Sequence, residues 1–300
     1  MELRKLGTEK PNPAARNLDK KSSLEIARII NKEDAKVAAA VKRELPQIAR
    51  AIDLIADSLR HGGRLIYVGA GTSGRIAALD AAECPPTFNT DPKTVQFVIA
   101  GGPKALAAAV EANEDSRSLG QREIAKRKPG KHDVVVGIAA SGRTPFTVAA
   151  IEYARRRGAK TVAVTCNRQS PLARAAHVAI VTEVGPEVVA GSSRMKGGTA
   201  QKMVLNMLST GAMTRLGYIY GNLMVNVHLK NQKLLQRGIA ILQTATGVDR
   251  KSAERTLRSA GSVSTALIML EAGVSRQTAV RALRSARGNA RQAIASARSL

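Results

Sequence analysis

Short apolar segments alternate with segments of helical periodicity through the middle of the chain. Five of them carry hydrophobic residues at successive positions, which is typical of parallel strands that helices bury on both faces. They span 64–68, 95–100, 133–139, 161–166 and 177–182. Apolar residues at three- and four-residue spacing predict helices between them, over 74–84, 103–112, 117–127 and 145–157. The pattern predicts a doubly wound α/β domain with a five-stranded parallel sheet flanked by helices.

Helical periodicity also dominates both ends of the chain. Residues 22–61 predict capped helices with a break at Pro46, because proline cannot continue the hydrogen-bond ladder. A long helix is expected in the Met-rich stretch that ends near Met213, and another over about 222–246. Three short helical patterns follow, and each ends in glycine. We therefore expect an N-terminal arm with helices (1–60), a domain built on the parallel sheet (61–220), a connecting helix (221–246) and a small C-terminal three-helix module (247–300).

Composition and charge narrow the class of protein. The 300 residues are 44% hydrophobic, and no apolar run approaches the ~20 residues that cross a bilayer. The N-terminus lacks the apolar segment of a signal peptide, so we expect a cytoplasmic protein with no membrane partner. The formal net charge of +24 attracts polyanions, but the basic residues are spread along the chain and only 2% of residues are aromatic. A basic surface is therefore favoured over a nucleic-acid-binding function.

The glycine pattern after the first strand predicts a phosphate site rather than an NAD site. The segment "GAGTSG" (69–74) fits G-x-G-x-x-G. The second strand, however, ends in Gly101-Gly102-Pro103 and lacks the acidic residue that binds the ribose of NAD. Thr72 and Ser73 instead place two hydroxyls beside the N–H groups of a helix N-terminus. That combination suits a single phosphate group.

A second loop of the same kind follows the third strand. Ser141, Gly142 and Thr144 precede a helix that has Pro145 at its first position. In a doubly wound sheet both loops open at the carboxyl ends of the strands, where ligands bind. Either loop alone fits a tight turn with a serine cap equally well, but the two together favour a phosphorylated ligand. The two cysteines and four scattered histidines lack metal-ligand spacing, so no metal is expected.

Longer motifs resemble a known family. The segments "YVGAGTSGRIAALDAAECPPTF", "AGGPKALAAAVEANEDS", "GIAASGRTPFTVAAIEYARRRGA" and "GPEVVAGSSRMKGGTAQKMVLNMLSTGAM" cover much of 64–213. They resemble SIS (sugar isomerase) domains and, more closely, the bacterial N-acetylmuramic acid 6-phosphate etherases, which are related to the vertebrate glucokinase regulatory protein. "DAAECPPTF" and "GSSRMKGGTAQK" are more specific than a glycine loop.

The resemblance implies a reaction. It is the cleavage of N-acetylmuramic acid 6-phosphate into N-acetylglucosamine 6-phosphate and D-lactate, by elimination and rehydration of the open-chain sugar. No metal or organic cofactor is implied, and the setting is the recycling of cell-wall sugars in the cytoplasm. SIS domains of this kind typically pair, so a homodimer is implied as well.

The resemblance also suggests the two catalytic carboxylates. It implies that Glu83 protonates the lactate oxygen and that Glu114 takes the proton from C2. Two carboxyls can divide this work when their environments separate their pKa values. We expect the helix that carries Glu83 to stop at Cys84-Pro85-Pro86. Glu111 and Asp115 are neighbours of Glu114, and the residues alone do not choose among the three.

Three further residues stand before the long Met-rich helix. Ser192, Ser193 and Lys196 offer hydroxyls and a cation for the sugar or the lactate carboxylate, but Ser193 suits the N-cap of that helix equally well. Two other functions remain open. A phosphosugar isomerase would interconvert aldose and ketose without releasing lactate. A non-catalytic sugar-phosphate sensor that binds a partner would have no need of Glu83 and Glu114.

Overall fold

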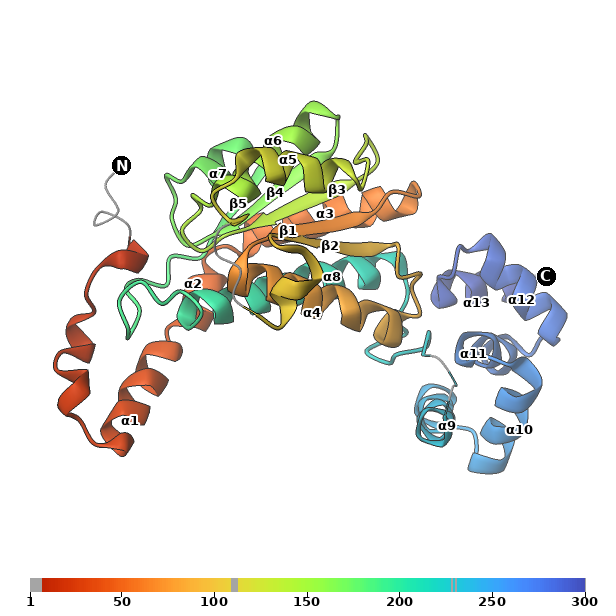
Figure 1. Ribbon diagram of the computed structural model, residues 1–300. Helices are drawn as coiled ribbons and strands as arrows, with labels where there is room; N and C mark the ends of the chain where they lie inside the picture. The colour runs from red at the N-terminus through yellow and green to blue at the C-terminus, as the bar shows by residue number, and fades with distance from the viewer. Residues whose placement is uncertain (1–6, 109–112, 228, 230, 300) are drawn as a thin grey trace. The chain divides into compact units, whose positions relative to one another are not determined.

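The computed structural model describes residues 7–108, 113–227, 229 and 231–299. The chain divides into two compact units. One comprises Met1–Ala81 and Lys93–Ser209, and contains the sheet; the other comprises Ala82–Pro92 and Thr210–Leu300, and is helical (Figure 1).

A five-stranded parallel sheet forms the centre of the first unit. Its strands are β1 (Leu65–Gly69), β2 (Val95–Ile99), β3 (Val134–Ile138), β4 (Lys160–Thr165) and β5 (Val178–Val181). Each lies within one residue of its predicted bounds. The strand order is β2-β1-β3-β4-β5 with every pair parallel. The predicted doubly wound fold class is confirmed, and the chain reverses its direction of winding between β1 and β3.

Helices cover both faces of the sheet (Figure 1). α5 (Arg117–Ala125), α6 (Pro145–Arg156) and α7 (Pro171–Ala175) lie on one face. Their apolar residues share a buried cluster with strand residues such as Ile66, Val68 and Val135. α4 (Gly71–Phe88) and α8 (Lys196–Leu216) lie on the other face. Burial on both sides explains why the strands are apolar at successive positions.

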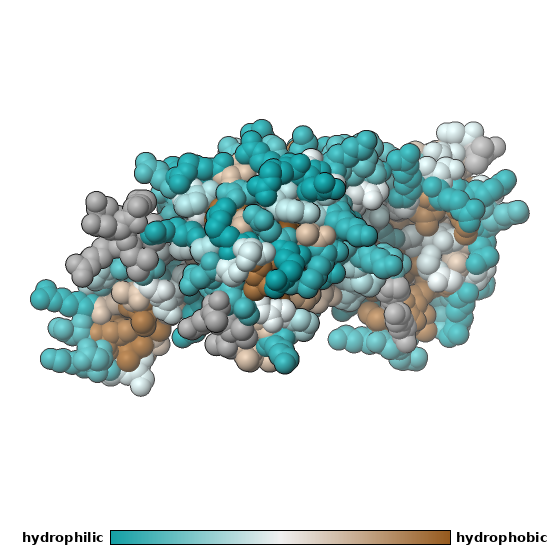
Figure 2. Space-filling model, turned by 45° about the horizontal axis from the view of Figure 1, so that its top comes forward, coloured by the Kyte–Doolittle hydropathy of each residue, from teal (hydrophilic) through white to brown (hydrophobic). Residues whose placement is uncertain are grey.

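Three helices precede the sheet: α1 (Ser23–Asp34), α2 (Val37–Lys42) and α3 (Leu45–Arg60). Ser22 caps α1, and Glu25 completes a capping box with it. Pro46 lies in the first turn of α3, so the predicted break there is confirmed. Most of the coloured surface seen in Figure 2 is hydrophilic. No helix among the described residues has the length and apolarity to span a bilayer.

Asp80 ties α4 to α8 and to the sheet. Its carboxylate accepts hydrogen bonds from the Tyr67 hydroxyl (2.7 Å), Asn206 Nδ2 (2.9 Å) and Ser209 Oγ (3.1 Å). Burial raises the pKa of Asp80, although these three hydrogen bonds oppose the rise. The contacts fix the position of the helix that carries the first glycine loop.

The predicted stop of α4 at Cys84-Pro85-Pro86 is wrong. The helix runs to Phe88 with both prolines inside it, and Asn89 follows in the left-handed region (φ 56°). The fixed φ of proline fits a helix, and the cost is that the carbonyl oxygens four residues earlier lose their N–H partners. One of these belongs to Ala82, which is exposed, so water can replace the missing donor.

In the described part of 103–112 the predicted α-helix is not formed. A short 3-10 helix spans Gly102–Leu106, and residues 109–112 lie outside the described part of the chain. The Arg75 guanidinium donates to the carbonyl oxygens of Ala105 (3.0 Å) and Ala108 (2.7 Å) in this segment.

The second unit holds α9 (Gln232–Thr246), α10 (Arg250–Ala260), α11 (Val263–Ala272), α12 (Arg276–Ser285) and α13 (Ala290–Arg298), which share one buried apolar cluster. The three short helices predicted after residue 247 are α10, α11 and α12. α9 begins about ten residues later than the predicted 222, because Tyr220 and Leu223 form a β-bridge there instead. The sequence pattern did not reveal α13, which Asn289 caps after a left-handed Arg287-Gly288 turn.

Candidate active site

The loops that follow β1 and β3 meet at the carboxyl edge of the sheet. β1 and β3 are hydrogen-bonded neighbours, and their last residues, Gly69 and Ile138, are paired. Residues 70–74 and 139–144 therefore leave the sheet side by side, at the point where the winding reverses. Ligands of doubly wound folds bind at this point.

The first loop turns directly into α4. Gly71 begins the helix with φ 51°, and Thr72 and Ser73 follow in its first turn. Thr72 is half-buried and Ser73 is buried. The N–H groups of a first turn have no acceptor inside the helix, and Ala70, which precedes it, has no side chain that can cap it. This start of α4 is suited to an anion.

The second loop has no room for a side chain at its glycine. Gly142 has φ 65°, and a Cβ there would lie 2.3 Å from Ser170 Oγ and 2.5 Å from Thr165 Oγ1. Asn167 holds the loop from outside, since its Nδ2 donates to the carbonyl oxygens of Ala140 (3.0 Å) and Ser141 (3.3 Å). Asn167 is a residue that sequence reasoning missed, because nothing local marks a contact 26 or 27 residues away.

The start of α6 resembles the start of α4. Thr144 is its N-cap residue, and Pro145 occupies the first turn as predicted. The Thr144 side chain makes no capping hydrogen bond. Ser141 Oγ accepts from the N–H of Arg143 (3.2 Å), so the hydroxyl proton of Ser141 points elsewhere. The hydroxyls of both residues can thus donate to a ligand oxygen.

Glu114 lies between the two loops. Its Oε1 would be 3.0 Å from a Cβ added at Gly71, so the carboxylate lies against the start of α4. Its backbone carbonyl accepts from the N–H of Phe146 (3.0 Å), in the first turn of α6. Glu114 therefore contacts the beginnings of both helices. Of its neighbours, Asp115 is exposed and Glu111 lies outside the described residues.

Glu83 lies on α4, far along the helix from the start that Glu114 contacts. It is exposed, and it follows Gly71 by twelve residues on one continuous helix. At about 1.5 Å of rise per residue, roughly 18 Å of helix separate the two positions. Within one chain, the two predicted catalytic carboxylates are thus not at the same end of α4.

At the start of α8 a protein carboxylate accepts hydrogen bonds from two first-turn N–H groups. Glu187 accepts hydrogen bonds from the N–H groups of Lys196 (3.1 Å) and Gly197 (2.8 Å). Glu187 is fully buried, and burial raises its pKa although the two N–H donors oppose the rise. Glu187 thus supplies the side-chain acceptor that the sequence suggested for Ser193.

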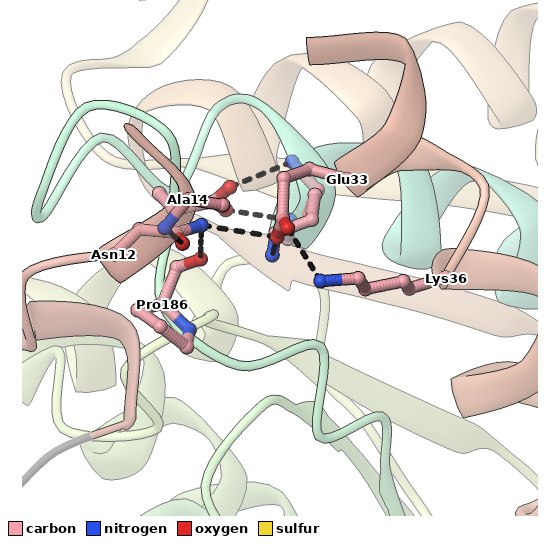
Figure 3. A network of polar contacts seen from close by, with 8 residues as sticks. Asn12, Ala14, Glu33, Lys36 and Pro186 are labelled. Carbon is pink, nitrogen blue, oxygen red and sulfur yellow. Dashed lines mark hydrogen bonds and ion pairs between the residues drawn. The ribbon is translucent and has the colours of Figure 1, made fainter. Parts of the chain in front are cut away.

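Lys196 is bound within the protein. Its Nζ lies 2.6 Å from Glu33 Oε2 of α1, and the two side chains are 1% and 3% exposed. Figure 3 shows Glu33 at the centre of a network in which Asn12 Nδ2 (3.0 Å) and Lys36 Nζ also donate to its carboxylate. Burial would raise the pKa of Glu33, but the donors from Lys196, Lys36 and Asn12 outweigh it and lower that pKa to about 2.

The first turn of α8, which follows Ser192 and Ser193, nevertheless lies against both loops. A Cβ added at Gly198 would contact Thr72 Cγ2 at 3.5 Å, and one added at Gly197 would contact Ala140 Cβ at 3.4 Å. Ser192 and Ser193 are half-buried. Among the residues that the structure describes, no three His, Cys, Asp or Glu side chains are grouped so as to hold a metal ion.

Comparisons with known proteins support this description of the fold and the loops. Residues 47–155 match the glucokinase regulatory protein N-terminal SIS domain, and residues 129–211 match the SIS domain. An N-acetylmuramic acid 6-phosphate etherase of Symbiobacterium thermophilum is 58% identical over 272 residues, 90% of each chain. One of Vibrio vulnificus is 52% identical over 271 residues, also 90% of each. A solved phosphoheptose isomerase of Francisella tularensis shares the fold at 17% identity, with a TM-score of 0.52 over 65% of this chain and 100% of that one.

Proposed function

Because the chain belongs to the N-acetylmuramic acid 6-phosphate etherase family, we propose that it converts N-acetylmuramic acid 6-phosphate and water into N-acetylglucosamine 6-phosphate and D-lactate. One observation carries the proposal. The starts of α4 and α6, each preceded by a loop with hydroxyl-bearing residues, flank Glu114 at the β1–β3 edge of the sheet. We place the reaction in the bacterial cytoplasm, in the recycling of cell-wall sugars.

The two loops bind the phosphate of the substrate. Thr72, Ser73, Ser141 and Thr144 offer hydroxyls, and Gly142 brings its backbone close to the ligand. The starts of α4 and α6 add the positive ends of two helix dipoles. Ser192 and Ser193 contact the sugar from the segment before α8. Lys196 acts by holding that segment, since its ammonium is paired with Glu33.

The chemistry needs a base and an acid on the sugar. Glu114 takes the proton from C2, which is acidic because it lies next to the open-chain aldehyde. The electron pair forms the C2–C3 double bond, and the C3–O bond to lactate breaks. Glu83 gives its proton to the departing lactate oxygen. Water then adds at C3 while C2 is reprotonated, so the same two groups act in reverse.

We propose that Glu83 reaches the site from the second subunit of a homodimer. The substrate spans less than about 10 Å from phosphorus to the ether oxygen, whereas roughly 18 Å of α4 separate Gly71, beside Glu114, from Glu83 in one chain. A two-fold axis can place the Glu83 of one copy at the loops of the other, and would do so for both sites at once.

The first experiment is an assay for D-lactate release from N-acetylmuramic acid 6-phosphate, without added metal or NAD, in oxygen-18 water. The proposal predicts lactate and label at C3 of the product sugar. A folded protein that binds the sugar phosphate but releases no lactate would refute it. Conversion between an aldose and a ketose phosphate would then favour an isomerase.

The shared site is tested by mixing two inactive variants, Glu83→Ala and Glu114→Ala, after dissociating and reassociating their subunits. Random pairing should restore about a quarter of wild-type activity, because half of the dimers gain one intact site of two. A same-chain site predicts no restoration. Mixtures of either variant with itself are the controls.

A further inference from the structure

Among the described residues, Gln201 of α8 is the only one whose side chain forms a hydrogen bond with the Ser73 side chain. Ser73 Oγ donates to Gln201 Oε1 at 3.0 Å, and the two residues are 8% and 1% exposed. Gln201 belongs to α8, 128 residues later in the sequence. Neither spacing nor periodicity in the sequence identifies Gln201 as a functional residue. Only its contact with Ser73 in the fold does so.

The direction of the Ser73–Gln201 hydrogen bond conflicts with phosphate binding by Ser73. A serine hydroxyl has one proton, and the oxygens of a phosphate dianion only accept. While Ser73 donates to Oε1 of Gln201, it has no proton for a phosphate. A phosphate ligand of Ser73 therefore needs this hydrogen bond to reverse.

The other atom of the Gln201 amide makes the reversal possible. Gln201 Nε2 is buried and has no hydrogen-bond partner among the residues that the structure describes. Turning the terminal amide by about 180° exchanges Oε1 and Nε2, so that Nε2 donates to Ser73 Oγ. Each orientation leaves one buried amide atom without a partner, so the two are close in energy. A ligand that favours one orientation can then select it.

We propose that Gln201 is a positioning residue that controls the proton of Ser73: its amide accepts that proton in the empty site, and donates to Ser73 when a phosphate binds. Ser73 then donates its proton to the phosphate in a charge-assisted hydrogen bond. The inference rests on the proposed phosphate-binding role of Ser73. It adds a residue from α8 that acts through Ser73 without touching the substrate.

The test is a double-mutant cycle on the binding of N-acetylglucosamine 6-phosphate, measured by titration calorimetry at mildly alkaline pH. In Gln201→Glu a carboxylate can only accept from Ser73, so the proton stays turned away from the phosphate. We expect the dissociation constant to rise about tenfold or more. In Gln201→Met, Ser73 is released to donate unaided, and the rise should be about threefold or less.

The same Gln201→Glu change in a Ser73→Ala background isolates the repulsion between the new charge and the phosphate. If Gln201 acts through Ser73, the change should weaken binding at least about threefold less there than in the wild type. Equal weakening in both backgrounds, or equal effects of the Glu and Met variants, would overturn the inference. Gln277→Glu adds the same charge at an exposed position of α12 and should leave binding unchanged.

Kinetics separate this inference from the proposed reaction. The Glu variant should raise KM while leaving kcat within about twofold, since Gln201 acts on phosphate binding alone. If the wild-type protein binds the sugar phosphate but releases no lactate, the proposed reaction is refuted. The double-mutant cycle on binding still tests the role of Gln201 in that case. Normal lactate release with an additive cycle refutes the role of Gln201 and leaves the reaction standing. A wild-type protein that does not bind the sugar phosphate refutes both.

Discussion

Three helices begin at the carboxyl edge of the sheet or beside it, and they differ in what occupies their first turns. α8 begins on Glu187, whose carboxylate takes the N–H groups of Lys196 and Gly197. α6 begins on Thr144, which makes no side-chain cap, and α4 follows Ala70, which has no polar side chain. In the proposed function the phosphate binds at the loops before α4 and α6, beside Glu114, whereas the first turn of α8 is already occupied by Glu187.

The difference shows how one structural device serves two purposes. A helix N-terminus attracts negative charge wherever it lies. At α8 the protein fills that position and adds a buried Lys196–Glu33 pair, which fixes the segment "SSRMKGG" against the two loops. At α4 and α6 we propose that the phosphate of the substrate takes this role, beside Glu114. The contrast supports phosphate binding at the two loops and a supporting part for α8.

The largest effect on stability is expected from a substitution that removes the partner of Lys196 at the start of α8. Glu33→Met would leave the buried ammonium of Lys196 without its carboxylate partner, which should lower the free energy of unfolding by about 3–5 kcal/mol. Urea unfolding followed by circular dichroism measures the change. The double variant Glu33→Met/Lys196→Met removes both charges and should recover much of the loss. If the double variant is no more stable than the single one, the ion pair does not hold the start of α8.

A somewhat smaller effect is expected from Gly142→Ala in the second loop. The new Cβ would overlap Ser170 Oγ and Thr165 Oγ1, and φ is 65°, so we expect a loss of about 2–4 kcal/mol. Thermal unfolding provides the measurement. Gly62→Ala is the matched control, because Gly62 has φ 75° with nothing within 4 Å of an added Cβ. It should lose only the strain, about 1 kcal/mol. Equal losses in the two variants would contradict the tight packing of the loop.

The glycines and hydroxyls of both loops could be predicted from the sequence, because a strand, a Ser-Gly turn and a helix start are neighbours along the chain. The five strands were predictable for the same local reason. Asn167 and Gln201 were not, since each acts on a partner that only the fold brings near. Glu187 was not either, since nothing in its sequence marks it as the acceptor for a helix that starts nine residues later. Pro85-Pro86 misled for a physical reason as well: the fixed φ of proline fits a helix, so α4 continues through both residues to Phe88.

In the loop before α6, Ser141→Ala should weaken substrate binding and leave the fold intact. The variant loses one hydroxyl donor to the phosphate, so KM should rise about tenfold, while kcat changes less than about threefold. Steady-state lactate release gives both constants. Ser192→Ala is the comparison variant, and it should raise KM less, because in the proposed site the segment before α8 contacts the uncharged sugar. An unchanged KM in Ser141→Ala would remove the second loop from the phosphate site.

The smallest expected effect is a pH dependence of stability that arises from Glu33, the partner of Lys196 at the start of α8. The pKa of Glu33 is lowered to about 2 in the fold, from a value of 4.5 for the unperturbed group. Its folded pKa is below its unfolded pKa, so its stabilising contribution is complete above pH 4.5 and is lost as the pH falls toward 2. The stability gap between the wild type and Glu33→Gln should therefore shrink by about 1–2 kcal/mol between neutral pH and roughly pH 3. Asp19→Asn, at an exposed carboxylate, should show no such convergence. A gap that stays constant with pH would mean that the Lys196–Glu33 pair contributes through packing rather than charge, and α8 would then differ from α4 and α6 only in its contact with Glu187.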